Sequence, residues 1–252
     1  MQSTPERKIH KTIKLLPDID WVEIPAGEFI FGEEKQQLRL TLETFYIARY
    51  PITNAQYQAF IDDGGYVDDR WWVDLERQTS PGESPWNQPN RPWTNVDWYE
   101  TIAFCRWLSQ QLGYEIRLPT EQEWEKAARG TDGREYPWGD HYREGFANVD
   151  EKGVRTTPSQ LDQTTAVGLY PQGTSPYGVM DMAGNVWEWC LNKNDNPIDT
   201  VIDKTEEYRV LRGGSWFSLP ESTRAAGRDG GSPDLRYSYR GFRVVCVSPI
   251  NH

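Results

Sequence analysis

Hydrophobic and polar residues alternate in several short segments of the chain, a pattern typical of strands that bury one face. These segments are residues 21–31, 38–42, 209–216 and 241–247. In the first segment, the side chains expected to be buried on either side of a Pro-Ala-Gly turn are Val22, Ile24, Phe29 and Phe31. In the last, one face is expected to hold Phe242, Val244 and Cys246, with Arg243 and Val245 opposite.

Apolar residues at helical spacing, combined with start and stop signals, predict three helices. They are a short helix between Thr53 and Gly64, a longer one over residues 97–112, and a short one between Thr120 and Gly130. Thr120 and Glu123 have the spacing of a capping box, in which each side chain bonds to the other residue's backbone amide. Gly113 can adopt the left-handed backbone that ends the second helix.

The remaining sequence predicts few regular elements. Residues 66–95 are rich in Pro, Gly, Trp and Asp, and we expect an ordered loop held by packed indole rings there. From residue 131 onward, turn-forming residues interrupt short apolar runs. We therefore predict an α+β domain over residues 21–250, preceded by an arm or linker over residues 1–20.

Amino-acid composition indicates what fills the core and which partners and compartment to expect. The 252 residues include 12 Trp and 13 Tyr, so large aromatic rings should build much of the core. The formal net charge of -11 repels phosphate backbones, which disfavours nucleic acid as a partner. The three cysteines lack metal-ligand spacing and are expected to be buried free thiols in a reducing compartment. With no apolar leader or span in the sequence, we expect a cytoplasmic protein, although a domain of a larger chain would look the same.

Six ordered blocks of sequence resemble the formylglycine-generating enzyme, or sulfatase-modifying factor, family. They begin at Trp21 (WVEIPAGEF), Arg117 (RLPTEQEWEKAARG), Tyr136 (YPWG), Tyr177 (YGVMDMAGNVWEW), Val210 (VLRGGSW) and Gly241 (GFRVV). This resemblance implies a C-type lectin-like fold with a small antiparallel sheet, two to three helices and long irregular loops.

The resemblance also implies where a catalytic centre should lie. The family's oxidase binds copper with two cysteines that follow the Gly-Gly-Ser-aromatic motif, and thiolates suit Cu(I). Here Ser218 stands where the first cysteine would fall, and the second has no counterpart. A related iron-dependent branch uses three histidines, whereas this chain has only His10, His141 and His252. We therefore expect neither copper nor iron, no catalytic residues, and no enzymatic activity.

Calcium is the metal that the resemblance leaves open, because the family holds structural Ca²⁺ with oxygen ligands. The residues that match one such site are Asp181, Gly184, Val186 and Glu188. Glu188 could instead cap loop amides or pair with an arginine. A second site would use Asn148 and Val149, but its acidic ligand has no clear counterpart near Ser159.

Between Trp216 and Gly241, residues of mixed chemical type interrupt a regular framework of Pro, Ala and Arg. This arrangement resembles the variable proteins of diversity-generating retroelements, in which Asn codons are randomised on one face of this fold. The predicted ligand-binding positions, all reachable by that route, are Phe217, Ser218, Leu219, Ser222, Gly227, Asp229, Gly230, Gly231, Ser232, Leu235, Tyr237, Ser238, Tyr239 and Arg240. The diversified segment would span about residues 212–243, and Glu221 departs from the pattern.

Tyr, Ser, Gly and Arg on a rigid scaffold give a large contact area with little ordering entropy. Our main interpretation is therefore a non-catalytic binding protein whose C-terminal face contacts a protein or another ligand. One alternative is a formylglycine-generating oxidase or related redox enzyme with a displaced site. Another is an accessory domain of a larger signalling protein.

Overall fold

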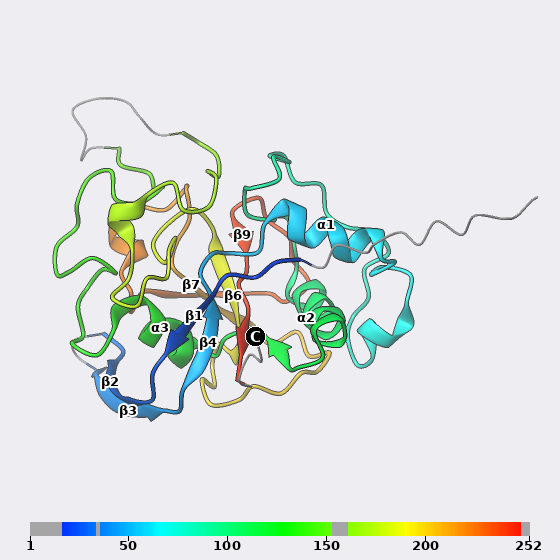
Figure 1. Ribbon diagram of the computed structural model, residues 1–252, viewed down its shortest axis with the longest axis horizontal. Helices are drawn as coiled ribbons and strands as arrows, with labels where there is room; N and C mark the ends of the chain where they lie inside the picture. The colour runs from blue at the N-terminus through cyan, green and yellow to red at the C-terminus, as the bar shows by residue number, and fades with distance from the viewer. Residues whose placement is uncertain (1–16, 34–35, 153–160, 248–252) are drawn as a thin grey trace, which may run out of the picture.

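The computed structural model describes residues 17–33, 36–152 and 161–247. Two small four-stranded sheets lie in the middle of the molecule with three α-helices around them, and a separate hairpin lies at the edge. Helices α1 (Asn54–Asp62) and α2 (Trp98–Leu112) lie on one side of the central strands, and α3 (Glu121–Arg129) lies on the other (Figure 1). The expected α+β class is confirmed.

The first sheet joins both ends of the described chain. Its strands follow the order β1 (Trp21–Ile24), β4 (Phe45–Ala48), β10 (Val245–Cys246) and β5 (Ile116–Arg117), and all pairs are antiparallel. The hairpin of β2 (Gly27–Phe31) and β3 (Leu38–Leu42) stands apart from it. Ile19 is already buried, so packing begins two residues before β1. Residues 1–16 of the expected arm lie outside the described residues.

The second sheet carries the segment in which we expected ligand binding. Its strands follow the order β8 (Arg228–Gly231), β7 (Arg209–Arg212), β6 (Trp187–Lys193) and β9 (Arg240–Gly241). The pairing of β6 with β9 is parallel, whereas β7 pairs antiparallel with both β6 and β8. Every residue of β6 is buried, so this strand forms the centre on which the edge strands are built.

Each α-helix begins at a residue whose side chain accepts a hydrogen bond from the first turn. Thr53, Asp97 and Thr120 are the N-caps, and all three form capping boxes. Helix α2 ends at Gly113, whose φ of 79° is left-handed as the sequence predicts. Short 3₁₀ turns occur at Asp69–Trp72, Pro171–Gly173 and Pro220–Thr223.

Aromatic rings fill the core between α1, α2 and β6, as the composition predicts. Tyr57 stacks on Trp93 with 4.5 Å between ring centroids and on Phe104 at 5.3 Å. Trp98 and Trp107 are fully buried beside them. Trp71 and Trp72 belong to the loop of residues 66–95, and both are buried in this core. Their burial holds the long loop in place.

Two of the predicted strands differ from the structure. The strand expected over residues 209–216 ends at Arg212, because Gly213 and Gly214 have φ values of 92° and 74° that a ladder cannot continue. The strand expected over residues 241–247 is divided between two sheets. Its alternation also fails, because Arg243 and Val245 are as fully buried as their neighbours.

Candidate functional site

The candidate site is the face formed by residues 216–240, which we call the C-terminal face. The chain leaves β7 through Gly213 and Gly214, and the amide of Trp216 then donates to the carbonyl of Asn185 at 3.1 Å. The Ser218 hydroxyl accepts a hydrogen bond from the Ser215 amide at 3.0 Å and so closes a tight turn. This turn presents Phe217 to solvent, with 62% of the residue exposed.

Five aromatic side chains form a continuous row along the C-terminal face, and we call this row the aromatic ladder. In order, its members are Trp86, Trp216, Phe217, Tyr239 and Tyr237. Trp86 and Trp216 meet edge to face at 5.4 Å, whereas Tyr237 and Tyr239 stack at 5.1 Å with an interplanar angle of 23°. Phe217 joins the two halves by stacking on Tyr239 at 6.3 Å. The ladder offers planar apolar surface on which a ligand can stack.

The expected ligand-binding residues fall into three groups by exposure. The exposed ones are Phe217, Leu219, Ser222, Asp229, Leu235 and Tyr237. The half-buried ones are Ser218, Gly227, Gly230, Ser232, Ser238 and Tyr239. Gly231 and Arg240 are buried. Most of these residues are thus at least partly accessible to a ligand, whereas Gly231 and Arg240 are not.

The arginines of the framework hold this segment against the rest of the domain. Arg236 forms two hydrogen bonds with the buried carboxylate of Glu100, at 2.8 and 2.6 Å. Arg228 donates from Nε to Glu121 at 3.0 Å. These contacts anchor the loop and give the C-terminal face a rigid base.

Arg240 differs from these anchors because its guanidinium lies among aromatic rings. Its Cζ is 4.5 Å from the ring centroid of Tyr237, 5.0 Å from that of Trp189 and 5.9 Å from that of Tyr239. Burial lowers the pKa of Arg240 from its usual value. Burial also raises the pKa of Tyr239. The sequence identifies Arg240 as a charged contact but gives no sign of this enclosure.

The cysteines do not form a copper site. Cys105, Cys190 and Cys246 are all buried, and they lie on α2, β6 and β10. Burial raises the pKa of the Cys105 thiol and of the Cys190 thiol well above the usual range, so the protonated forms are favoured. The thiolate pair that Cu(I) requires therefore does not fit these residues. The expectation of buried free thiols is confirmed.

The described residues do not fit a three-histidine iron site either. His141 is the one histidine within the described ranges, since His10 and His252 lie outside them. Within the same ranges, no group of three or more His, Cys, Asp or Glu residues could hold a metal ion.

Glu188, one of the expected calcium ligands, is engaged with an arginine. Arg243 donates to both Glu188 carboxylate oxygens, at 2.6 and 2.7 Å, and the Trp124 indole donates to Oε2 at 2.7 Å. Asp181 accepts a hydrogen bond from the Gly168 amide at 2.7 Å. Because Ca²⁺ needs free oxygen lone pairs, this geometry fits the arginine pairing better than a calcium site built on Glu188.

The other residues expected to bind calcium lie close by. The Asn148 carbonyl accepts from the Asn185 amide at 2.8 Å, and Asn148 forms a bridge with Gly184. Val149 and Val186 are buried. Calcium at these carbonyls stays a prediction.

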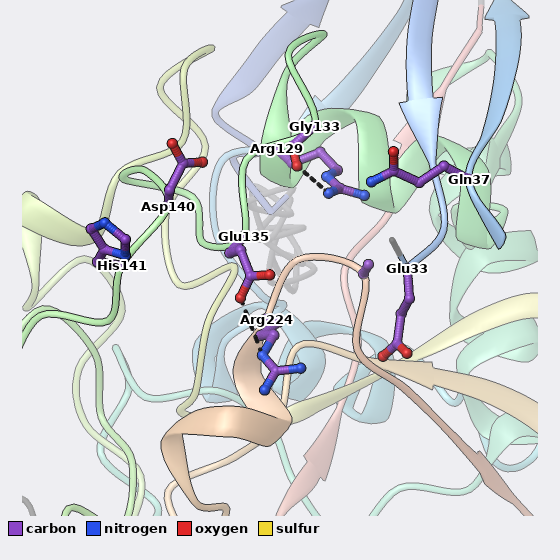
Figure 2. Close-up of a pocket in the computed structure, with 9 residues that line it drawn as sticks. Glu33, Gln37, Arg129, Gly133, Glu135, Asp140, His141 and Arg224 are labelled. Carbon is purple, nitrogen blue, oxygen red and sulfur yellow. Dashed lines mark hydrogen bonds and ion pairs between the residues drawn. The ribbon is translucent and has the colours of Figure 1, made fainter. Parts of the chain in front are cut away.

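A polar cavity of about 610 Å³ lies elsewhere, between α3 and the loop that carries His141. Figure 2 shows Glu33 and Gln37 on one side of it and Asp140 and His141 on the other. Glu135 and Arg224 form an ion pair within it at 3.3 Å. The sequence assigns no role to this cavity, and two of its arginines have carboxylate partners, Arg129 with Glu125 and Arg224 with Glu135.

Comparison with known proteins identifies the family. The model of the sulfatase-modifying factor enzyme 1-like domain matches residues 9–247. The chain belongs to this family. Hercynine oxygenase of Mycobacterium tuberculosis is 34% identical over 236 residues, which cover 80% of this chain and 52% of that protein. Formylglycine-generating enzyme of Thermomonospora curvata is 29% identical, with 89% of this chain and 92% of that protein covered. The chain therefore spans about half the length of the hercynine oxygenases it matches.

Two solved structures share the fold of this sulfatase-modifying factor family member. PvdO from Pseudomonas aeruginosa gives a TM-score of 0.73 at 24% identity, with 90% of this chain and 94% of that chain covered. Treponema denticola variable protein 1 gives 0.70 at 24% identity, with 90% and 95% covered. At this level of identity the likeness concerns the fold alone.

The relatives correct one expectation. We expected no enzymatic activity because the cysteine pair and the histidine set are missing. Relatives named as hercynine oxygenases are 30 to 34% identical, and a formylglycine-generating enzyme is 29% identical, so these findings contradict that expectation. Among the described residues, no helix is long and apolar enough to cross a membrane.

Proposed function

We propose that this chain binds the substrate of an oxidase or oxygenase reaction on its C-terminal face. The observation that supports this most directly is the aromatic ladder, whose members Trp216 and Phe217 complete and follow the Gly213-Gly-Ser-Trp motif. In the family, the reactive residues follow that same motif. The named activities of the relatives favour a redox enzyme over an accessory domain.

The described residues support the substrate-binding part of this proposal. Phe217 and Tyr237, both exposed, can stack against a planar or cationic group of the substrate. Tyr239 supports them from a half-buried position, and Arg236 and Arg228 fix the loop beneath. Because the copper and iron ligand sets do not fit, the redox metal would be held by another part of the protein or by a partner.

Calorimetric titration with hercynine and with a cysteine-containing peptide tests this proposal. These two probes follow from the names of the relatives and from the family's oxidase chemistry. We expect Phe217→Ala to weaken binding of the preferred probe by about tenfold, because a stacked ring contributes about 1.4 kcal/mol to affinity. Leu169→Ala is the control. Leu169 is 55% exposed, close to the 62% of Phe217, but it lies outside the C-terminal face. If the wild type binds neither probe, or if Phe217→Ala binds like the wild type, the proposal is wrong.

A second candidate function is recognition of a protein by a diversified C-terminal face. The contrast in burial favours it, because framework residues Pro220, Ala225 and Ala226 are buried. The neighbouring variable positions Phe217, Leu219 and Ser222 are exposed. Sequencing the neighbouring DNA tests this candidate. It requires a reverse transcriptase gene and a near-copy of the segment coding residues 212–243 that differs at adenines. Their absence would exclude diversification.

A further inference from the structure

Arg240 is buried without a carboxylate partner. Five arginines are buried within the described part of the chain, and four of them pair with a carboxylate. These four pairs are Arg129 with Glu125, Arg209 with Asp203, Arg212 with Glu125, and Arg243 with Glu188. Arg240 is 7% exposed, and its Nε and Nη1 have no hydrogen-bond partner in the described part. The other four buried guanidinium groups thus have a carboxylate as counter-charge, and the guanidinium of Arg240 has none within the described residues.

The packing around Arg240 shows that its position is built and not incidental. Its backbone pairs with Trp187 on β6, and its amide donates to the Tyr237 carbonyl at 3.1 Å. A Cβ atom placed on Gly231 would lie 2.8 Å from Nη1 of Arg240 and 2.7 Å from the Trp189 ring. The absence of a side chain at Gly231 therefore makes room for the guanidinium.

No neighbouring carboxylate supplies the missing charge. Asp229 lies two residues before Gly231 on β8, and it is the carboxylate that acts on the charge of Arg240. However, Asp229 is exposed, its Oδ1 accepts the Gly230 amide at 2.8 Å, and it forms no ion pair with Arg240. The rings of Trp189, Tyr237 and Tyr239 offset the positive charge in part, but rings accept no strong hydrogen bond from Nε or Nη1.

We propose that Arg240 is an anion receptor on the C-terminal face, and that it binds a carboxylate whose attached apolar or aromatic group lies on the ladder. This inference rests on the proposed function and deepens it by naming the chemical class of the ligand. Nε and Nη1 of Arg240 are unpartnered donors, and a carboxylate oxygen is the strong acceptor that suits a guanidinium. The adjoining rings of Phe217 and Tyr237 provide the surface for the rest of the ligand.

Tyr237 controls access to the guanidinium. Its ring covers Arg240 at 4.5 Å, yet the residue is 37% exposed, and its hydroxyl forms no hydrogen bond within the described residues. The ring can therefore turn outward without breaking a polar contact. We expect the ligand to replace this ring against the guanidinium and to stack beside it.

Benzoate and benzamide are suitable probes, because they share a shape and differ in charge. Binding to the whole protein is followed by tryptophan fluorescence and by the ¹⁵N-edited NMR signal of the Arg240 Nε–H. We expect benzoate to bind at least tenfold more tightly than benzamide and to shift that signal. We expect Arg240→Gln to remove the preference for benzoate while benzamide binding persists. Equal affinities in the wild type, or a preference that survives in Arg240→Gln, would overturn the inference.

Two further variants distinguish the loss of a ligand contact from the loss of the folded structure. Arg70→Gln is the matched control, because Arg70 also lies over an indole, 4.9 Å from the Trp71 centroid, but is exposed and paired with Asp68. It should retain the preference for benzoate. Gly231→Ala displaces the guanidinium without removing it, and should weaken benzoate binding selectively. If Arg240→Gln does not fold, saturating benzoate that leaves the wild-type Arg240 Nε–H signal unmoved overturns the inference.

The same titrations separate the inference from the proposed function. If both probes need Phe217 but bind equally, the C-terminal face binds ligands and the anion receptor is wrong. If benzoate binding depends on Arg240 and not on Phe217, the anion receptor stands and the stacking surface is wrong. If neither probe binds, both are wrong.

Discussion

Replacing Glu188 with glutamine removes the charge at the centre of the domain. Glu188 lies on β6 and is fully buried, and it joins Arg243, which precedes β10, to Trp124 on α3. Glutamine keeps the shape, and its oxygen at the Oε2 position can accept two of the three hydrogen bonds, those from Arg243 Nε and Trp124. Its amide group then faces donors, which leaves a buried guanidinium without its counter-charge.

The size of the effect follows from what Arg243 retains. Removing one partner of a buried ion pair costs about 3–5 kcal/mol of unfolding free energy. Here Nη1 still donates to the Ala48 carbonyl at 3.0 Å, and Nη2 still donates to the Met180 carbonyl at 3.0 Å. These contacts place Glu188→Gln toward the lower end, and the glutamine amide group that faces Nη2 of Arg243 adds about 1 kcal/mol. We expect a total loss of about 3–4 kcal/mol.

Urea denaturation followed by circular dichroism measures this loss. Glu135→Gln is the control, because Glu135 pairs with Arg224 but is 39% exposed on its side chain, and such pairs contribute about 0–1 kcal/mol. In a cycle with Arg243→Met, the double variant should be more stable than the sum of the single losses predicts. A loss below about 1 kcal/mol for Glu188→Gln would refute the reasoning. So would a chelator that destabilises the wild type and leaves Glu188→Gln unchanged, since that result indicates a calcium ligand.

Two other predictions concern single residues. Burial and the neighbouring Glu100 raise the pKa of Asp97 to about 8. The folded state therefore binds a proton that the unfolded state releases near pH 4, so the unfolding free energy should fall by up to about 1.4 kcal/mol per unit between pH 4 and pH 8. Asp97→Asn, which keeps an N-cap acceptor, should flatten that slope in urea titrations at several pH values. If the slope is unchanged, the pH dependence of stability comes from other groups. Gly213→Ala should cost at least about 1–2 kcal/mol in the same assay, because φ is 92° and the new Cβ lies 2.9 Å from the Trp124 ring. A neutral result would show that this turn relaxes freely.

The elements that could be predicted from the sequence are those set by local chemistry. All three helices begin at capping boxes and α2 ends at Gly113, because a cap involves side chains and amides only three residues apart. The C-terminal strands could not be predicted in the same way. β9 and β10 are two residues each and belong to different sheets, so their partners come from distant parts of the chain.

The location of the candidate site could be predicted from the sequence, but the burial of individual residues within it could not. Mixed residue types between Trp216 and Gly241 indicated an exposed surface, and Phe217 and Tyr237 are exposed. Burial of Gly231 and Arg240 depends on Trp189 from β6, and no pattern within the segment reveals that contact. The expectation of an inactive protein failed for a related reason, since it drew a conclusion about chemistry from missing residues alone.

The central claim is that ligands bind on the C-terminal face and not in the polar cavity near His141. Indole NMR signals report on both places, because Trp216 lies in the aromatic ladder whereas Trp138 donates to the His141 carbonyl at 3.0 Å. During titration with hercynine, we predict that the indole signals of Trp216 and Trp86 shift and saturate together, with Trp138 unchanged. Shifts at Trp138 with an unmoved Trp216 would contradict the account.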